Sequence, residues 1–112
     1  MALDEKRRVT EPALVELSGG LDLGSIARWE AEVGKAGTGS ATVVLDLTGV
    51  DFLDSAGVHG LFRMLAGLDA QGKRLVVVAP REGRVRRLLE ILDVQRLVLM
   101  CESREEALAK RR

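Results

Sequence analysis

Two short apolar runs constrain the fold of this chain more than any other feature. Residues 43–47 read Val-Val-Leu-Asp-Leu and residues 75–79 read Leu-Val-Val-Val-Ala, so nearly every side chain in both runs is apolar. A strand that is covered on both faces has this composition, and such strands occur mainly in parallel sheets with helices packed on them. The two runs therefore predict two central strands of an α/β fold.

Helical patterns alternate with these runs. Apolar side chains recur at the three- and four-residue spacing of one helix face in three segments. The predicted faces are Ile26, Trp29, Val33 and Ala36; Val58, Leu61, Phe62, Leu65 and Leu68; and Val85, Leu88, Leu89 and Leu92, with Pro80 in the first turn of the last helix. Because Trp29 belongs to such a face, we interpret it as a core residue rather than a stacking platform. Ser103 and Glu106 form a capping-box pattern that predicts a short terminal helix.

The remaining strands complete the predicted order. Residues 7–10 and 13–17 are two candidate strands on either side of Glu11-Pro12, and residues 97–100 are the last. This order predicts a single α/β domain whose mixed, mostly parallel sheet has about five strands, with at least one antiparallel edge, packed by about four helices. We expect the domain to occupy residues 1–112, with a core at about 9–109 and flexible termini.

The charge balance excludes several classes of partner. The 112 residues include 17 Lys and Arg and 17 Asp and Glu, so no bulk charge draws the chain to nucleic acid. The one cysteine, Cys101, suits a reducing compartment. The first residues lack the apolar core of a signal peptide, and no apolar run approaches the ~20 residues that span a bilayer. These features predict a cytoplasmic protein that contacts neither nucleic acid nor a membrane directly.

The junction between the first central strand and its helix is the candidate functional site. Asp54 and Ser55 stand there, after a predicted turn at Thr48-Gly49 and an apolar bridge that includes Phe52. Ser55 is a favoured N-cap, because its oxygen can accept a hydrogen bond from a free N–H group of the first turn. The same position displays a hydroxyl at a helix start, where an anion is tolerated, so Ser55 is also a candidate phosphoryl acceptor. The local pattern leaves both interpretations open.

The sequence lacks the groups that enzymatic chemistry requires. His59 is the single histidine, and no carboxylates stand at metal-ligand spacing around it or around Cys101. His59 falls one helical turn after Ser55, but no Gly-x-Ser-x-Gly motif surrounds the serine. A phosphate on Ser55 would instead add about −1.5 to −2 charges beside Asp54. The sequence therefore predicts a binding switch rather than an enzyme, without metal or cofactor.

A cluster of arginines makes the third predicted helix locally basic. Its members are Arg81, Arg84, Arg86 and Arg87. Such a cluster can bind a phosphate or an acidic partner, but it is also typical of a solvated helix face, which is the interpretation that we favour.

The residues around Ser55 also resemble a known family. Residues 46–58, Asp-Leu-Thr-Gly-Val-Asp-Phe-Leu-Asp-Ser-Ala-Gly-Val, resemble the signature of the STAS domain (sulphate transporter and anti-sigma factor antagonist). Residues 17–22 resemble the segment that leads into the first helix of the family, and the match extends over about residues 9–109. The free-standing form of the domain is similar to bacterial anti-sigma factor antagonists.

This resemblance implies partner switching in the control of transcription. The unphosphorylated antagonist would bind an anti-sigma factor, a serine kinase of the histidine-kinase-like ATPase type, and so free a sigma factor. The kinase would phosphorylate Ser55 and break the complex, and a PP2C-type, metal-dependent phosphatase would restore it. ATP and Mg²⁺ then belong to the kinase, and this chain needs no cofactor. The resemblance places the partner-binding residues at one tip: Asp22, Asp54, Ser55, Ala56, Gly57 and His59.

The sequence departs from the family pattern at three of its positions. Gly20 stands where the family often has Glu, Ala56 where it often has a second hydroxyl residue, and His59 where a small residue is usual. Two alternatives also stay open: a STAS subunit that regulates the cytoplasmic ATPase of a transporter, and a component of a stressosome-type scaffold.

Overall fold

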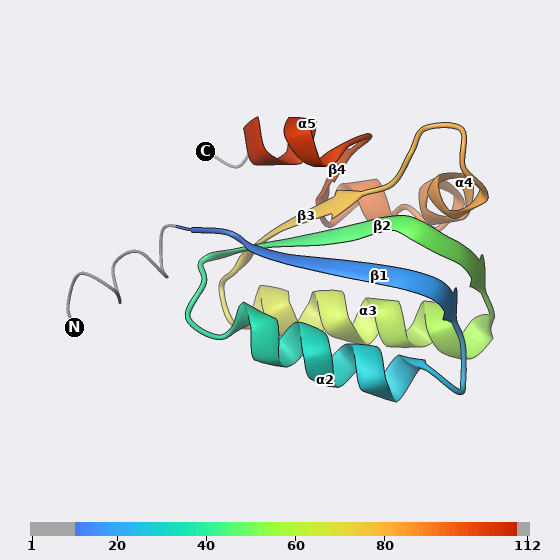
Figure 1. Cartoon of the computed structure of the whole chain (residues 1–112), viewed down its shortest axis with the longest axis horizontal. Coiled ribbons are helices and arrows are strands. Elements are labelled where there is room, and N and C mark those ends of the chain that lie inside the picture. The colour runs from blue at the N-terminus through green and yellow to red at the C-terminus, as the bar shows by residue number, and fades with distance from the viewer. Residues whose placement is uncertain (1–10, 110–112) are drawn as a thin grey trace.

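Four parallel strands form the described sheet of this protein. In a computed structural model that describes residues 11–109, the strands are β1 (Ala13–Leu21), β2 (Thr42–Leu53), β3 (Arg74–Val78) and β4 (Leu99–Cys101). They lie in that order, and each neighbouring pair is parallel (Figure 1). The predicted α/β architecture is confirmed, with four strands described instead of about five. The strand expected at residues 7–10 and the tail at residues 110–112 lie outside the described residues.

Helices cover both faces of this sheet. α2 (Ile26–Gly37) and α3 (Ser55–Ala70) run along one face, and α5 (Arg104–Ala109) packs on the other (Figure 1). α4 (Arg84–Ile91) and a short 3-10 helix, η1 (Val94–Arg96), connect β3 to β4. Within residues 11–109 no helix has both the length and the apolar character needed to span a membrane.

The first predicted central strand is buried on both faces. Val43, Val44, Leu45 and Leu47 of β2 are at most 1 % exposed. Because successive side chains of a strand point to opposite faces, Val43 and Leu45 join the large apolar cluster with α2 and α3. Val44 instead joins a small cluster with Ala107 of α5. Both layers therefore pack on β2, and β3 is covered in the same way, with Leu75 and Val77 in the large cluster and Val76 and Val78 in the small one.

The turn predicted at Thr48-Gly49 is wrong. β2 continues to Leu53, and its register against β1 shifts twice on the way. Each shift places one extra residue on β2, which is the arrangement of a β-bulge and bends a strand. The chain therefore stays paired with β1 up to the point where α3 begins.

Two predicted helix faces are offset in the structure. On α2, Ala36 is exposed and Gly37 is buried, where a Cβ would lie 3.3 Å from Cδ2 of Leu68. On α3, Val58 and Phe62 are only partly buried, because two glycines share the buried face of the helix. The spacing pattern is built from apolar side chains alone, so it does not identify a buried helix face on which close packing requires glycine.

The region around α4 also differs from the prediction. α4 begins at Arg84, so Pro80 precedes the helix instead of lying in its first turn. Leu92, predicted on the buried face of this helix, is 36 % exposed. The last strand begins at Leu99, two residues later than predicted, because Asp93 adopts a left-handed conformation (φ 61°) and the chain first forms η1.

Candidate functional site

The ends of β1 and β2 and the starts of α2 and α3 meet at one end of the molecule (Figure 1). We call this end, formed by residues 20–25 and 52–59, the tip. Parallel strands present their carboxyl ends at the same edge of a sheet, which is where α/β proteins place their functional groups. The sequence-predicted residues from Asp22 to His59 therefore come together from two segments about thirty residues apart in the sequence.

Asp54, rather than Ser55, caps α3. Its Oδ1 accepts a hydrogen bond from Gly57 N at 2.8 Å, and its backbone is extended, as an N-cap requires. Ser55 is the first residue of the helix, so the prediction that it forms the cap is wrong. Asp and Ser are both favoured at the N-cap. We attribute the choice of Asp54 over Ser55 to the contacts that Asp54 makes with the neighbouring loop.

Those contacts join α3 to the loop between β1 and α2. Asp54 N donates to Leu21 O at 3.2 Å, and the second carboxylate oxygen of Asp54 accepts from Leu23 N at 3.3 Å. One side chain therefore holds the start of the helix and the loop beside it in fixed positions.

Asp22 organises the same loop from the other side. Its Oδ1 accepts from Gly24 N at 3.0 Å and from Ser25 N at 3.1 Å. Ser25 makes no capping bond for α2, although it occupies the capping position; its hydroxyl donates to Gly20 O at 2.6 Å. Because both aspartates accept backbone N–H groups, their negative charges are held at the tip.

Two glycines allow α3 to approach this loop closely. A Cβ on Gly57 would lie 1.8 Å from Leu21 O, and a Cβ on Gly60 would lie 1.9 Å from Cγ1 of Ile26. Neither position tolerates a side chain without a shift of its surroundings. The structure thus places Gly57, expected among the partner-facing residues, in the interior of the tip.

Ser55 lies on the outside of this junction. Its side chain is exposed, and within residues 11–109 no group forms a hydrogen bond with its hydroxyl. Ala56 beside it is partly buried, and His59 is exposed one turn further along α3. The candidate phosphoryl acceptor is therefore accessible, and it has a neighbouring imidazole on the same helix.

Two apolar side chains at the tip were missed by the sequence analysis. Leu23 is 79 % exposed and Phe52 is 54 % exposed. They belong to the two segments that carry Asp22 and Ser55, and a Cβ on Gly20 would lie 3.5 Å from Cδ2 of Phe52. Their exposure could have been predicted from the sequence, because both residues lie next to the end of a strand, where an apolar side chain does not have to be part of the core. We therefore add Leu23 and Phe52 to the candidate contact residues of the tip.

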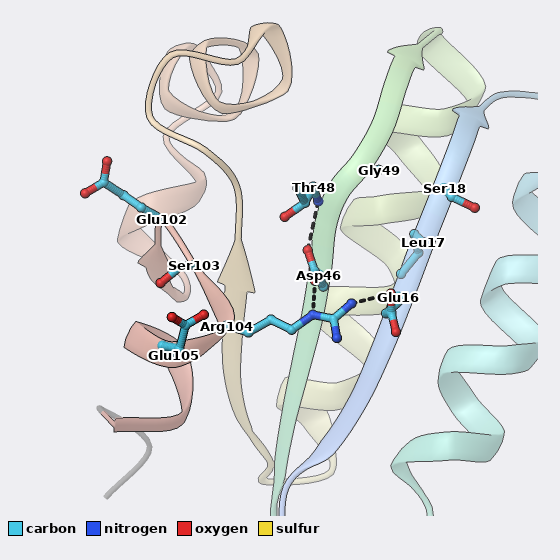
Figure 2. A pocket seen from close by; sticks show the side chains of 10 residues that line it. All are labelled: Glu16, Leu17, Ser18, Asp46, Thr48, Gly49, Glu102, Ser103, Arg104 and Glu105. Carbon is cyan, nitrogen blue, oxygen red and sulfur yellow. Dashed lines mark hydrogen bonds and ion pairs between the residues drawn. The ribbon is translucent and has the colours of Figure 1, made fainter.

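A second polar cluster lies on the face of the sheet that α5 covers. There the side chain of Arg104, from α5, extends across β2 to β1 (Figure 2). Its Nε donates to Asp46 Oδ2 at 2.5 Å, and a terminal nitrogen pairs with Glu16. Asp46 is 4 % exposed and also accepts from Thr48 N at 2.9 Å. Burial alone would raise the pKa of Asp46, but the hydrogen bonds from Thr48 and Arg104 and the Arg104 charge together lower this pKa below its ordinary value of 3.8.

This cluster fastens α5 to the sheet. It lines an open hollow of about 470 Å³ that shares no residue with the tip. The predicted cap of α5 supports the same contact, because Ser103 Oγ accepts from Glu106 N at 3.2 Å beside Arg104. Within the described residues, no group of three or more His, Cys, Asp or Glu side chains is arranged to hold a metal ion.

Comparison with known proteins adds a family and a shared fold. A model of the STAS domain family matches residues 3–107. The chain is similar to the phosphorylated form of the Bacillus cell fate determinant SpoIIAA, with 21 % identity, a TM-score of 0.67, and coverage of 91 % of this chain and 92 % of that one. It is also similar to an anti-sigma factor antagonist from Mycobacterium paratuberculosis, with 24 % identity, a TM-score of 0.69, and coverage of 88 % and 83 %.

A sulfate transporter family protein from Wolinella succinogenes has the same fold. The identity is 18 %, the TM-score is 0.75, and the coverage is 88 % of this chain and 82 % of that one. At such identities these likenesses establish the fold alone. Comparison with the curated proteins gives no match.

Proposed function

The chain belongs to the STAS domain family, and on that premise we propose that it is an anti-sigma factor antagonist controlled by phosphorylation of Ser55. The unphosphorylated form binds an anti-sigma factor serine kinase of the histidine-kinase-like ATPase type and releases a sigma factor. Phosphorylation of Ser55 by this kinase abolishes binding, and a PP2C-type phosphatase restores it. The chain acts in the cytoplasm as a binding protein, not as an enzyme.

The observation that carries the proposal is the environment of Ser55. Its hydroxyl is exposed at the first position of α3, and no described group bonds it. A kinase can therefore reach the hydroxyl without unfolding the helix. The exposed Leu23 and Phe52 supply an apolar contact area on the same tip for a partner to cover.

The charges at the tip explain how a phosphate would act as a switch. It would add about −1.5 to −2 charges next to Asp54, whose carboxylate already accepts a hydrogen bond from Gly57 N at the helix start. The helix dipole offsets only about 0.3–1 kcal/mol of this repulsion. The fold survives because the group stays in water, whereas a partner that covers an unpaired charge loses several kcal/mol of binding free energy.

The direct test needs a candidate serine kinase, which is sought among the products of the neighbouring genes and among proteins that copurify with this chain. We expect incubation with ATP to phosphorylate Ser55, as located by mass spectrometry, and the modified chain to lose binding in calorimetry. Ser55→Asp should abolish binding and Ser55→Ala should retain it. Ser40→Asp is the matched control, because Ser40 precedes β2 at the opposite end of the sheet and should leave binding unchanged. An unmodified Ser55, or full binding by Ser55→Asp, would reject the proposal.

The second candidate is a STAS subunit that regulates the cytoplasmic ATPase of a transporter. The fold shared with the sulfate transporter family protein from Wolinella succinogenes supports it. Affinity purification from cells separates the two functions. A transporter ATPase as the stoichiometric partner would favour the second candidate, and a small ATPase-type kinase would favour the first.

A further inference from the structure

The four arginines at the start of α4 have two different structural roles. Arg86 is nearly buried: its terminal nitrogen donates to Ala79 O at 2.8 Å, and its Nε donates to Glu90 Oε2 at 3.3 Å. Arg81 pairs with Glu102 at 3.1 Å. These two side chains bind parts of their own fold, so they are structural.

Arg84 and Arg87 are different. Both are exposed, and in residues 11–109 neither side chain forms an ion pair or hydrogen bond. With Ile91 they follow the i, i+3, i+7 spacing of one helix face. Ile91 is 71 % exposed, so this face of α4 presents two unpaired guanidinium groups and one apolar side chain.

The position of these charges is unfavourable for the isolated chain. The first turn of α4 contains no acidic residue, and Gly83 at the N-cap supplies no side-chain oxygen. The helix dipole is positive at this end, so cations there are disfavoured. Asp51 lines the same hollow as Arg84, and Glu82 precedes the helix, but within the described structure neither pairs with either arginine. A carboxylate from outside the chain would complete the arrangement.

We propose that the face of α4 formed by Arg84, Arg87 and Ile91 is a docking surface for an acidic segment of a protein partner. Guanidinium groups bind carboxylates through paired hydrogen bonds, and the apolar end of the face requires an apolar side chain opposite Ile91. The segment therefore carries at least two carboxylates and one apolar residue at matching helical spacing.

Charge complementarity favours a protein over other anionic partners. Tight binding to nucleic acid requires many phosphate contacts, and recognition of anionic membranes requires clusters of about four to eight cations. Within residues 11–109, this face has two cations without a partner, in a chain with 17 basic and 17 acidic residues. It shares no residue with the tip, so the two surfaces can be tested separately.

Photo-crosslinking in the producing cells tests the proposal, with a photoreactive phenylalanine analogue at position 91. We expect one protein adduct whose crosslinked peptide contains two or more carboxylates. The adduct should disappear in Arg84→Glu/Arg87→Glu and persist in Arg28→Glu/Lys35→Glu, which reverses two exposed charges on α2. It should also persist in Ser55→Asp, which separates this surface from the proposed switch. Circular dichroism should confirm that each variant is folded.

The mapped peptide then gives a quantitative test. Its affinity for the intact chain should fall about tenfold or more in the Arg84→Glu/Arg87→Glu variant, because two charge-assisted contacts are lost. Two crosslinking results would overturn the proposal: no protein adduct, or an adduct to lipid or nucleic acid. It would also be overturned by a crosslinked peptide without carboxylates, or by a peptide affinity that is the same in the Arg84→Glu/Arg87→Glu variant as in the wild-type chain.

Discussion

The tip and the Arg104 cluster are both rich in charge, but they differ in how their polar groups are satisfied. In the Arg104 cluster, the buried Asp46 accepts hydrogen bonds from Thr48 and Arg104, and Arg104 also pairs with Glu16. At the tip, two carboxylates bond backbone N–H groups, while the hydroxyl of Ser55 stays free within the described chain. Polar groups that are satisfied internally hold a fold together, and a group left exposed and unbonded is available to other molecules.

Among the changes that test this comparison, a substitution of Gly57 should have the largest effect on stability, because Gly57 lies in the closely packed contact between α3 and the loop of the tip. Gly57→Ala places a Cβ 1.8 Å from Leu21 O, and we expect a loss of about 3 kcal/mol in the free energy of unfolding. Gly67→Ala on the same helix is the control, because no atom lies within 4 Å of its Cβ position; it should be neutral or stabilising by up to ~1 kcal/mol. Urea denaturation of both variants measures the difference, and equal stabilities would show that the tip is not closely packed.

The Arg104 cluster should respond to the loss of one charge. Asp46→Asn keeps an acceptor for Thr48 N but removes the buried charge that Arg104 pairs with, so we expect a loss of about 2 kcal/mol in unfolding free energy. Glu30→Gln, which breaks the exposed ion pair with Arg63, should cost less than ~1 kcal/mol. Similar losses in the two variants would remove the distinction between buried and exposed charge.

The pH dependence of stability should identify Asp46 as the responsible group. The pKa of Asp46 is lowered in the folded chain, so the ionised carboxylate stabilises the fold. This stabilisation is fully present at pH values above the ordinary pKa of 3.8, and it is lost as the pH falls through the lowered pKa of the folded chain. The stability difference between the wild-type chain and Asp46→Asn should therefore shrink as the pH falls below 3.8. Denaturation curves between pH 7 and pH 2.5 measure it, and a constant difference would assign the stabilisation to another group.

Removing the cap at the tip should have a smaller effect. Asp54→Ala deletes the bonds to Gly57 N and Leu23 N, and we expect a loss of about 1 kcal/mol in unfolding free energy. Amide exchange should accelerate at both N–H groups. Protection that is unchanged at Leu23 would mean that the loop is held by other contacts.

The smallest effect on stability belongs to Ser55. Ser55→Asp should change the unfolding free energy by less than ~0.5 kcal/mol, because the side chain is exposed and unbonded in the described chain. The proposed loss of partner binding would then occur without any loss of fold. A destabilisation as large as that of Asp46→Asn would contradict the contrast between the two clusters, and thermal denaturation decides it.

Much of the fold could be predicted because its signals are local. The apolar runs of β2 and β3 and the spacing on the helices depend on neighbouring residues only, and they predicted the alternation of strands and α-helices and the parallel sheet, although not η1. The position of Ser55 at a helix start is also local. The β-bulges of β2 were not predicted, because they depend on pairing with β1.

The details of the site depend on contacts between distant segments. The choice of Asp54 over Ser55 as the cap rests on Leu21 and Leu23, more than thirty residues away. The close approach at Gly57 arises from the same loop. The partner of Asp46 stands 58 residues later, on α5. No pattern within a single segment identifies such pairs.

The glycine contact beneath the tip has a consequence for how such proteins diversify. The backbone of α3 packs directly against Leu21 at Gly57, so substitutions at Gly57 would displace the start of the helix that carries Ser55. Leu23, Phe52 and His59, in contrast, point into solvent and contribute little to the interior. Under the proposed function, a duplicated copy of this chain can therefore change its partner through surface substitutions alone, while the displayed hydroxyl keeps one location.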